Sequence, residues 1–167
     1  NGIIHEEVSV GENVVIKGEI NIGCGTQIKD NVVIEGDVNI GKNVLIKSGT
    51  IIGQKGFNFV KDENNIPLPF IHMGKVIIGD HVELGALNTV AQGTLGATII
   101  SDYVKTDDHV HIAHNVKIGR ASLITPHVMI AGSVSIGEDC WLGPNCSIID
   151  HISIGKNVYV GMGAVVT

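Results

Sequence analysis

The sequence places a branched aliphatic residue at every sixth position. A six-residue period fits neither the 3.6-residue period of an α-helix nor the two-residue alternation of a long strand. It fits short strands joined by tight corners, whose stacked coils bury one continuous column of side chains. The repeat therefore predicts an all-β, parallel β-helix of three hexads per coil, with residues 1–167 forming a single domain. The first part of the column comprises Ile4, Val10, Ile16, Ile22, Ile28, Ile34, Ile40, Ile46 and Ile52.

The column continues through most of the remaining chain. It returns at Ile78, Leu84 and Val90, and after a shift of four residues it runs from Ile100 to Val166. Asparagine recurs three residues after the column position, and asparagine tolerates positive φ. We therefore expect a tight corner at each of Asn13, Asn31, Asn43, Asn115 and Asn157.

Composition excludes several classes of protein. The net charge is −6 without a cluster of Lys or Arg, which argues against nucleic-acid binding. No apolar run is long enough to span a membrane. The three cysteines match no disulfide framework or zinc motif, and we expect small buried thiols in a reducing, cytoplasmic protein. We predict no bound metal or cofactor.

Two segments interrupt the repeat. Residues 53–75 carry two prolines and three phenylalanines, and residues 91–99 shift the phase of the column. Long irregular segments are usually functional. We expect both to bulge from the coil close together and to form a cleft against its regular wall.

Three residues along one edge of the coil have the chemistry for acyl transfer. His114 follows the column residue Ile112 by two positions, which points it outward. Gly132 lies 18 residues, or one coil, further on, and His151 lies two coils and one residue beyond His114. A histidine can take the proton from an incoming amine. A bare glycine N–H can stabilise the oxyanion of the tetrahedral intermediate.

Other polar residues leave alternatives open. Asp107 and Asp108 stand one hexad before His114, and one of them could orient it, although a solvated corner carboxylate is equally consistent. His109 and His111 occupy alternate positions of an expected strand. Cys140 and Cys146 should point inward, so direct attack by the substrate is favoured over a covalent intermediate.

Long segments of the chain resemble the N-acyltransferase family of lipid A synthesis. The similarity covers NVLIKSGTIIGQKGFNFVKDENNIP, GKVIIGDHVELGALNTVAQGTLGATII and HVHIAHNVKIGRASLITPHVMIAGSVSIG. The GFNF and IAHNVKIG segments are its most specific parts. The resemblance implies a left-handed β-helix and transfer of an acyl group from a thioester to the amine of a nucleotide-linked amino sugar. It covers the β-helix core only, so the chain is either part of a longer protein or a short relative.

The resemblance also implies roles for individual residues. His114 is then the general base, Gly132 the oxyanion donor and His151 a second active-site histidine. The acyl-donor and substrate groove is implied at Phe57, Phe59, Asp107 and Asn115. Where the family reads TIDRG, this chain reads TVAQG, with Ala91 and Gln92 in place of an acid and a base.

The resemblance further implies a homotrimer with active sites between subunits. The co-substrate is then acyl carrier protein or acyl-CoA, and the acceptor a UDP- or dTDP-linked amino sugar.

Two other functions remain open on the sequence. A zinc enzyme of the γ-carbonic anhydrase type shares this fold and has two ligand histidines five residues apart, as His109 and His114 are. Its third ligand would fall at Met73, with His72 nearby in the irregular segment. A purely structural β-helix is the second alternative, although it has no need of the 53–75 segment or the line of His114, Gly132 and His151.

Overall fold

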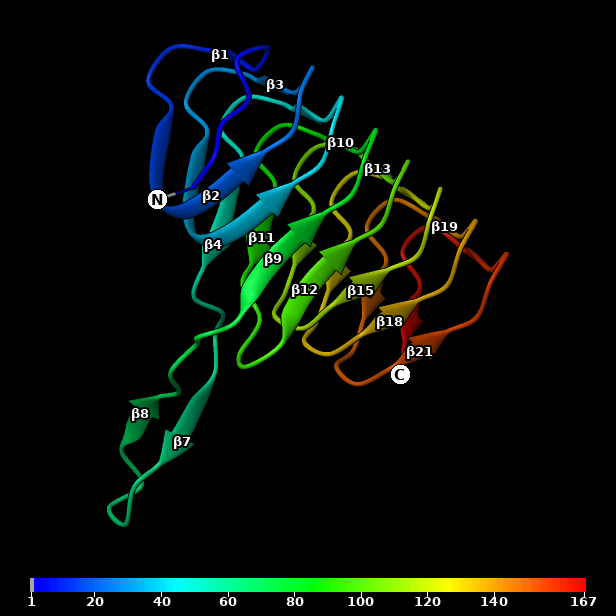
Figure 1. Cartoon of the computed structure of the whole chain (residues 1–167). Coiled ribbons are helices and arrows are strands. Elements are labelled where there is room, and N and C mark those ends of the chain that lie inside the picture. The colour runs from blue at the N-terminus through cyan, green and yellow to red at the C-terminus, as the bar shows by residue number, and fades with distance from the viewer. Residues whose placement is uncertain (1) are drawn as a thin grey trace.

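The computed structural model describes residues 2–167 as three strand faces wound around one axis (Figure 1). One face is an eight-stranded parallel sheet. Its strands are β1 (Ser9–Val10), β3 (Gln27–Ile28), β5 (Leu45–Ile46), β10 (Glu83–Leu84), β13 (Lys105–Thr106), β16 (Leu123–Ile124), β19 (Trp141–Leu142) and β22 (Tyr159–Val160).

The other two faces form one thirteen-stranded sheet, because two long strands cross the corner between them. These strands are β2 (Val15–Ile22) and β4 (Val33–Ile40). The second face continues through β6 (Ile51–Gln54), β11 (Thr89–Ala91), β14 (His111–Ile112), β17 (Met129–Ile130), β20 (Ser147–Ile148) and β23 (Val165–Val166). The third face continues through β9 (Lys75–Ile78), β12 (Ala97–Ile100), β15 (Lys117–Ile118), β18 (Ser135–Ile136) and β21 (Ser153–Ile154).

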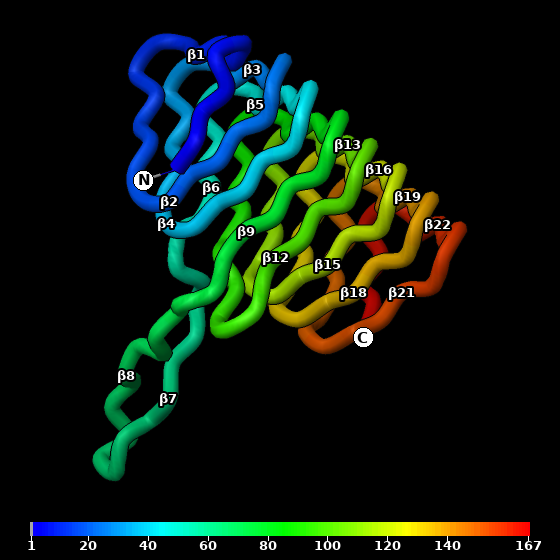
Figure 2. The backbone as a smooth tube through the Cα atoms, viewed as in Figure 1, coloured from blue at the N-terminus to red at the C-terminus, as the bar shows by residue number. Residues whose placement is uncertain are grey.

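The strands of each face stack in parallel and in register. Ile112 pairs with Ile130, which pairs with Ile148, so each coil repeats the previous one (Figure 2). In Figure 1 the chain advances from left to right while β9, β12 and β15 point upward on the near face, which is a left-handed winding. The prediction of a left-handed parallel β-helix is therefore confirmed. This handedness is an exception to the usual right-handed crossover.

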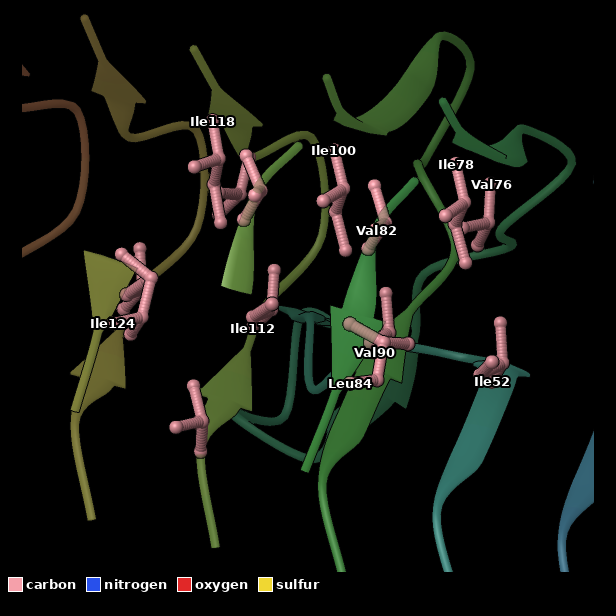
Figure 3. Close-up of a cluster of buried hydrophobic side chains, with 14 of the residues drawn as sticks. Ile52, Val76, Ile78, Val82, Leu84, Val90, Ile100, Ile112, Ile118 and Ile124 are labelled. Atoms are coloured by element: carbon pink, nitrogen blue, oxygen red, sulfur yellow. The ribbon is translucent and has the colours of Figure 1, made fainter. Parts of the chain in front are cut away.

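The aliphatic column forms the core. Ile52, Val90 and Ile112 are fully buried within it (Figure 3). Each such side chain stabilises the fold by about 1.5–3 kcal/mol relative to an exposed one. Cys140 and Cys146 point inward as expected.

Two details of the core prediction are wrong near the N-terminus. Ile4 and Val10 are 46% and 51% exposed, since only one neighbouring coil covers them. Cys24 is only partly buried.

The predicted corners are confirmed by their backbone. Asn13, Asn31, Asn43, Asn115 and Asn157 all have φ between 53° and 60°. Residues other than asparagine adopt the same conformation, among them His109 with φ 59° and His151 with φ 62°. The placement of His109 on a strand is therefore wrong: it forms a corner, and only His111 lies on β14.

Within residues 53–75, the first interruption, the chain leaves the coils of the β-helix and forms an arm. It carries an antiparallel pair of its own, β7 (Phe59–Lys61) and β8 (Pro67–Pro69), which projects away from the coils (Figure 1). The base of the arm meets the second interruption, because Met73 and Gly74 donate backbone hydrogen bonds to Thr94 and Gly93. The two interruptions are thus adjacent, as predicted. Within residues 2–167 there is no helix long and apolar enough to cross a membrane.

Candidate active site

His114, Gly132 and His151 come together at the corner that follows β14, β17 and β20. They line one cavity of about 310 Å³ with Asp150, Asn58 and Phe57 of the arm. The ring of His114 lies over Gly132, since a Cβ added to Gly132 would stand 2.6 Å from Cε1 and 2.8 Å from Nε2 of the imidazole. The predicted line of imidazole, glycine and imidazole is therefore formed within a single chain.

In the part of the chain that the structure describes, the backbone N–H of Gly132 makes no hydrogen bond, although the N–H groups at the same position of several other corners do. The equivalent N–H groups of Glu12, Lys42, Asp80 and Ala86 each donate to an aspartate of the next coil, respectively Asp30, Asp80, Asp102 and Asp108, at 2.7–2.8 Å. Asp150 occupies this place one coil beyond Gly132. Its carboxylate instead lies 3.8 Å from Nε2 of His151. Within residues 2–167 the Gly132 N–H has no hydrogen-bond partner.

The orientation of His114 is set by Asn115. Thr94 donates its backbone N–H to Oδ1 of Asn115 at 2.9 Å, which fixes the amide so that Nδ2 faces His114. Nδ2 lies 3.2 Å from Nδ1 of the imidazole. Asn115 therefore joins the second interruption to His114, a positioning role that the sequence alone did not reveal.

The environment of His114 favours its neutral form. Partial burial lowers the pKa of His114 below 6.5, and the neighbouring His72 and His151 lower it further, while Asp150 acts in the opposite direction. A base must be unprotonated to accept a proton, so a lowered pKa keeps His114 competent at neutral pH.

A second cavity of about 240 Å³ shares His114, Gly132 and Phe57 with the first. Its other walls are mainly small or apolar: Ala91, Ala113, Met129 and Ala131, with His111 and Lys55 at the side. Phe57 is 90% exposed and packs edge-on against Phe59 at 4.9 Å between ring centroids. The site therefore has a polar half and an apolar half that meet at His114.

Asp107 is not brought to His114 within the chain. It lines a different cavity, against Lys105, Leu123, Thr125 and Trp141 on the eight-stranded face. Asp108 accepts a hydrogen bond from the Ala86 amide and so closes a corner. Neither aspartate orients His114 within the chain.

His72 is a member of the site that the sequence did not predict as such. It is buried at the base of the arm, and its ring stands edge-to-face with that of His114, with centroids 5.5 Å apart. Gln92, one of the departures from the family pattern, donates to the backbone carbonyl of His72 at 3.0 Å. The irregular local sequence gave no periodic signal from which this contact could be predicted.

A three-histidine metal site is not assembled in the described part of the chain. Among residues 2–167 no group of three His, Cys, Asp or Glu side chains is placed to hold a metal ion. His109 stacks on His127 at another corner, 4.9 Å between centroids. Of the ligand histidines that the zinc alternative needs, only His72 and His114 are neighbours.

The fold and this site define a hexapeptide-repeat protein with an outward histidine over a free glycine amide. The sequence profile of the family described as bacterial transferase hexapeptide (six repeats) matches residues 19–54 and 133–167. The chain is 48% identical over 77 residues to UDP-3-O-acylglucosamine N-acyltransferase 2 of Legionella pneumophila strain Paris, and 46% identical over 76 residues to UDP-3-O-acylglucosamine N-acyltransferase of Coxiella burnetii strain RSA 493. Each match covers 46% of this chain and 22% of the relative.

Solved structures share the fold over nearly the whole chain. A UDP-N-acetylglucosamine O-acyltransferase from Moraxella catarrhalis has a TM-score of 0.79 at 22% identity, covering 98% of this chain and 66% of its own. A UDP-N-acetylglucosamine acyltransferase from Campylobacter jejuni has a TM-score of 0.66 at 20% identity, covering 98% and 64%. The solved structures thus share the fold, and the sequence matches to the N-acyltransferases bear out the resemblance. The chain spans only about a fifth of the length of the curated relatives that it matches.

Proposed function

We propose that the chain is the catalytic β-helix of an N-acyltransferase that acts on a nucleotide-linked amino sugar. The observation that carries the proposal is the imidazole of His114 above the free N–H of Gly132, at the junction of a polar and an apolar cavity. The similarity to UDP-3-O-acylglucosamine N-acyltransferases supports the substrate class. The donor is an acyl thioester of acyl carrier protein or CoA, and no bound cofactor takes part.

In the proposed reaction the amine of the sugar attacks the thioester carbonyl. A C–N bond forms, and the carbonyl oxygen becomes an oxyanion that the Gly132 N–H stabilises. His114 accepts the proton released from the amine and passes it to the departing thiolate as the C–S bond breaks. The acyl chain lies along Ala113, Ala131 and Met129, while the sugar occupies the polar cavity with Asp150 and His151.

The proposal includes a homotrimer in the cytoplasm. Within one chain the cavity of Asp107 and the site of His114 are lined by separate sets of residues on different faces. A neighbouring copy packed against the second face would bring its own eight-stranded face, with Asp107, toward His114. The active site would then be shared between two subunits.

The proposed activity is tested by incubating the protein with a 3-hydroxyacyl thioester and UDP-3-O-acyl-glucosamine, followed by mass spectrometry of the sugar nucleotide. We expect one added acyl group, joined through an amide that survives mild alkali. Parallel reactions replace the acceptor by a dTDP-linked amino sugar or by UDP-N-acetylglucosamine, or replace the donor by acetyl-CoA. Amide formation with the dTDP-linked sugar or with acetyl-CoA would keep the proposed reaction but change the substrate. Acylation of a hydroxyl in UDP-N-acetylglucosamine, with no transfer to any amine, would contradict the proposal.

The pH dependence of kcat/KM provides a second test. Because the pKa of His114 is lowered below 6.5, more than half of it is neutral at pH 6.5. We therefore expect kcat/KM at pH 6.5 to exceed half of its plateau, and to fall only at lower pH as His114 becomes protonated. The groups facing His114 are His72, His151 and Asp150. Since Asp150 raises the pKa, Asp150→Asn should move the acidic limb to lower pH, and a limb centred above pH 6.5 would exclude His114 as the base.

A further inference from the structure

His72 presents a buried nitrogen without a partner. Its side chain is only 4% exposed, and Nδ1 lies 3.0 Å from the carbonyl oxygen of Phe70. A carbonyl only accepts hydrogen bonds, so Nδ1 of His72 carries the proton, and Nε2 of the neutral ring is an acceptor. Among residues 2–167 it is the one fully buried side-chain nitrogen or oxygen that lacks a hydrogen bond. A buried polar atom of this kind requires an explanation, since nearly all others in folded proteins are paired.

The nearest imidazole to this acceptor is that of His114. Both rings approach Gly56: a Cβ added there would stand 2.9 Å from Nε2 of His72 and 2.9 Å from Cδ2 of His114. Glycine at this position is therefore what lets the two rings meet. Of the ring atoms of His114, Cδ2 comes nearest to this position beside Nε2 of His72, and it offers no N–H in the ring orientation held by Asn115.

That ring orientation is unfavourable for a base. With Nδ2 of Asn115 donating to Nδ1, the proton of neutral His114 resides on Nε2, the nitrogen beside Gly132. Nε2 then has no lone pair to receive a proton from the substrate. A half-turn of the ring about the Cβ–Cγ bond exchanges the positions of Cδ2 and Nδ1, and so brings Nδ1 to the edge that faces His72.

We propose that His72 is a positioning residue that accepts a hydrogen bond from Nδ1–H of His114 in the half-turned orientation and so leaves Nε2 of His114 free to act as the base. The catalytic use of this contact rests on the proposed acyl transfer. The contact itself fixes the tautomer of His114 in the free protein, which can be measured without substrate. Asn115 and His72 then hold opposite tautomers of the same ring. His72 exchanges no proton with the substrate.

Two substitutions separate the two nitrogens of His72. His72→Asn retains a side-chain N–H near the position of Nδ1, so the bond to Phe70 and the base of the arm are preserved while the Nε2 acceptor is lost. His72→Gln extends an amide oxygen to the position of Nε2 and restores the acceptor. If His72 were only structural, His72→Asn should retain more activity than His72→Gln. If His72 positions His114 as proposed, His72→Gln should retain more activity and the wild-type tautomer of His114.

The tautomer is read directly from the ¹⁵N shifts of ¹⁵N-histidine-labelled protein, with the His114 signals assigned by their loss in His114→Ala. In the wild-type protein we expect the proton of neutral His114 on Nδ1. It should move to Nε2 in His72→Asn and return to Nδ1 in His72→Gln. A proton on Nε2 of His114 in the wild type, or the same tautomer in all three proteins, would overturn the proposal. Stoichiometric zinc in the purified protein, lost in His72→Asn, would also overturn it.

Kinetics provide the second readout. His72→Asn should lower kcat about 10–100-fold, with little change in KM. This loss is smaller than the roughly 10²–10⁴ expected when the general base itself is removed, because His114 is still present. His72→Gln should recover most of that loss. Equal losses in both variants, or a change confined to KM, would contradict a positioning role. Because the ¹⁵N experiment needs no substrate, absence of acyl transfer with the expected tautomers would refute the proposed function and leave the His72–His114 contact standing.

Discussion

Replacing His114 by alanine is expected to lower kcat for amide formation by about 10²–10⁴, the usual contribution of a general base. The ring stands over Gly132 at the junction of the two cavities, where a proton released from the attacking amine can reach it. His151 lies in the same cavity but is exposed and has the Asp150 carboxylate 3.8 Å away. The measurement is single-turnover amide formation at saturating donor and acceptor.

The control for this experiment is His127→Asn. His127 is exposed, stacks on His109 away from the site, and has φ 60°, which asparagine tolerates. It should leave both kcat and the oligomeric state unchanged. Wild-type turnover in His114→Ala, with the control also active, would exclude His114 as the base.

Replacing Gly132 by alanine is the second substitution with a large expected effect. The added methyl group would stand 2.6 Å from Cε1 of His114, closer than any real Cβ contact, so the imidazole must move. The same methyl group obstructs the approach of the thioester to the Gly132 amide. Loss of one oxyanion donor alone typically costs about 10²–10³ in kcat, and we expect a loss of at least this order.

The control for Gly132→Ala is Gly155→Ala, because a Cβ at Gly155 meets no atom within 4 Å and its φ is not in the left-handed region. Neither glycine has φ in the left-handed region, so neither substitution strains the backbone, and the thermal unfolding midpoint of each variant is measured beside its activity. An equal loss of activity in both proteins would indicate a general effect on the coil, and it would remove the support for Gly132 as the oxyanion donor.

The repeat made the fold predictable because one period sets strand length, corner position and core together. Ile112, Ile130 and Ile148 are 18 residues apart in sequence and neighbours in space, so counting residues also places His114 over Gly132. The same counting failed at the N-terminal coil, where Ile4 and Val10 have too few neighbours to be buried. Periodicity gives the direction of a side chain but not whether another coil covers it.

The site residues that were not predicted from the sequence lie where the six-residue period is interrupted. His72 and Gln92 belong to the two interruptions, whose path depends on contacts between them and not on spacing. Asp150 follows the period, yet its carboxylate turns toward His151 and leaves the Gly132 amide free. Such a choice between two hydrogen-bonding partners is a matter of side-chain rotation, which sequence spacing does not encode.

A crystal structure of the assembled protein with its acylated sugar nucleotide bound tests the roles of His114 and Gly132 most directly. We expect the new amide nitrogen within hydrogen-bonding distance of His114 Nε2, and the amide oxygen pointing to the N–H of Gly132. We also expect the acyl chain to lie along Ala113 and Ala131. A product seated elsewhere, with its amide remote from both His114 and Gly132, would contradict the central claim that this imidazole and this backbone amide carry out the transfer.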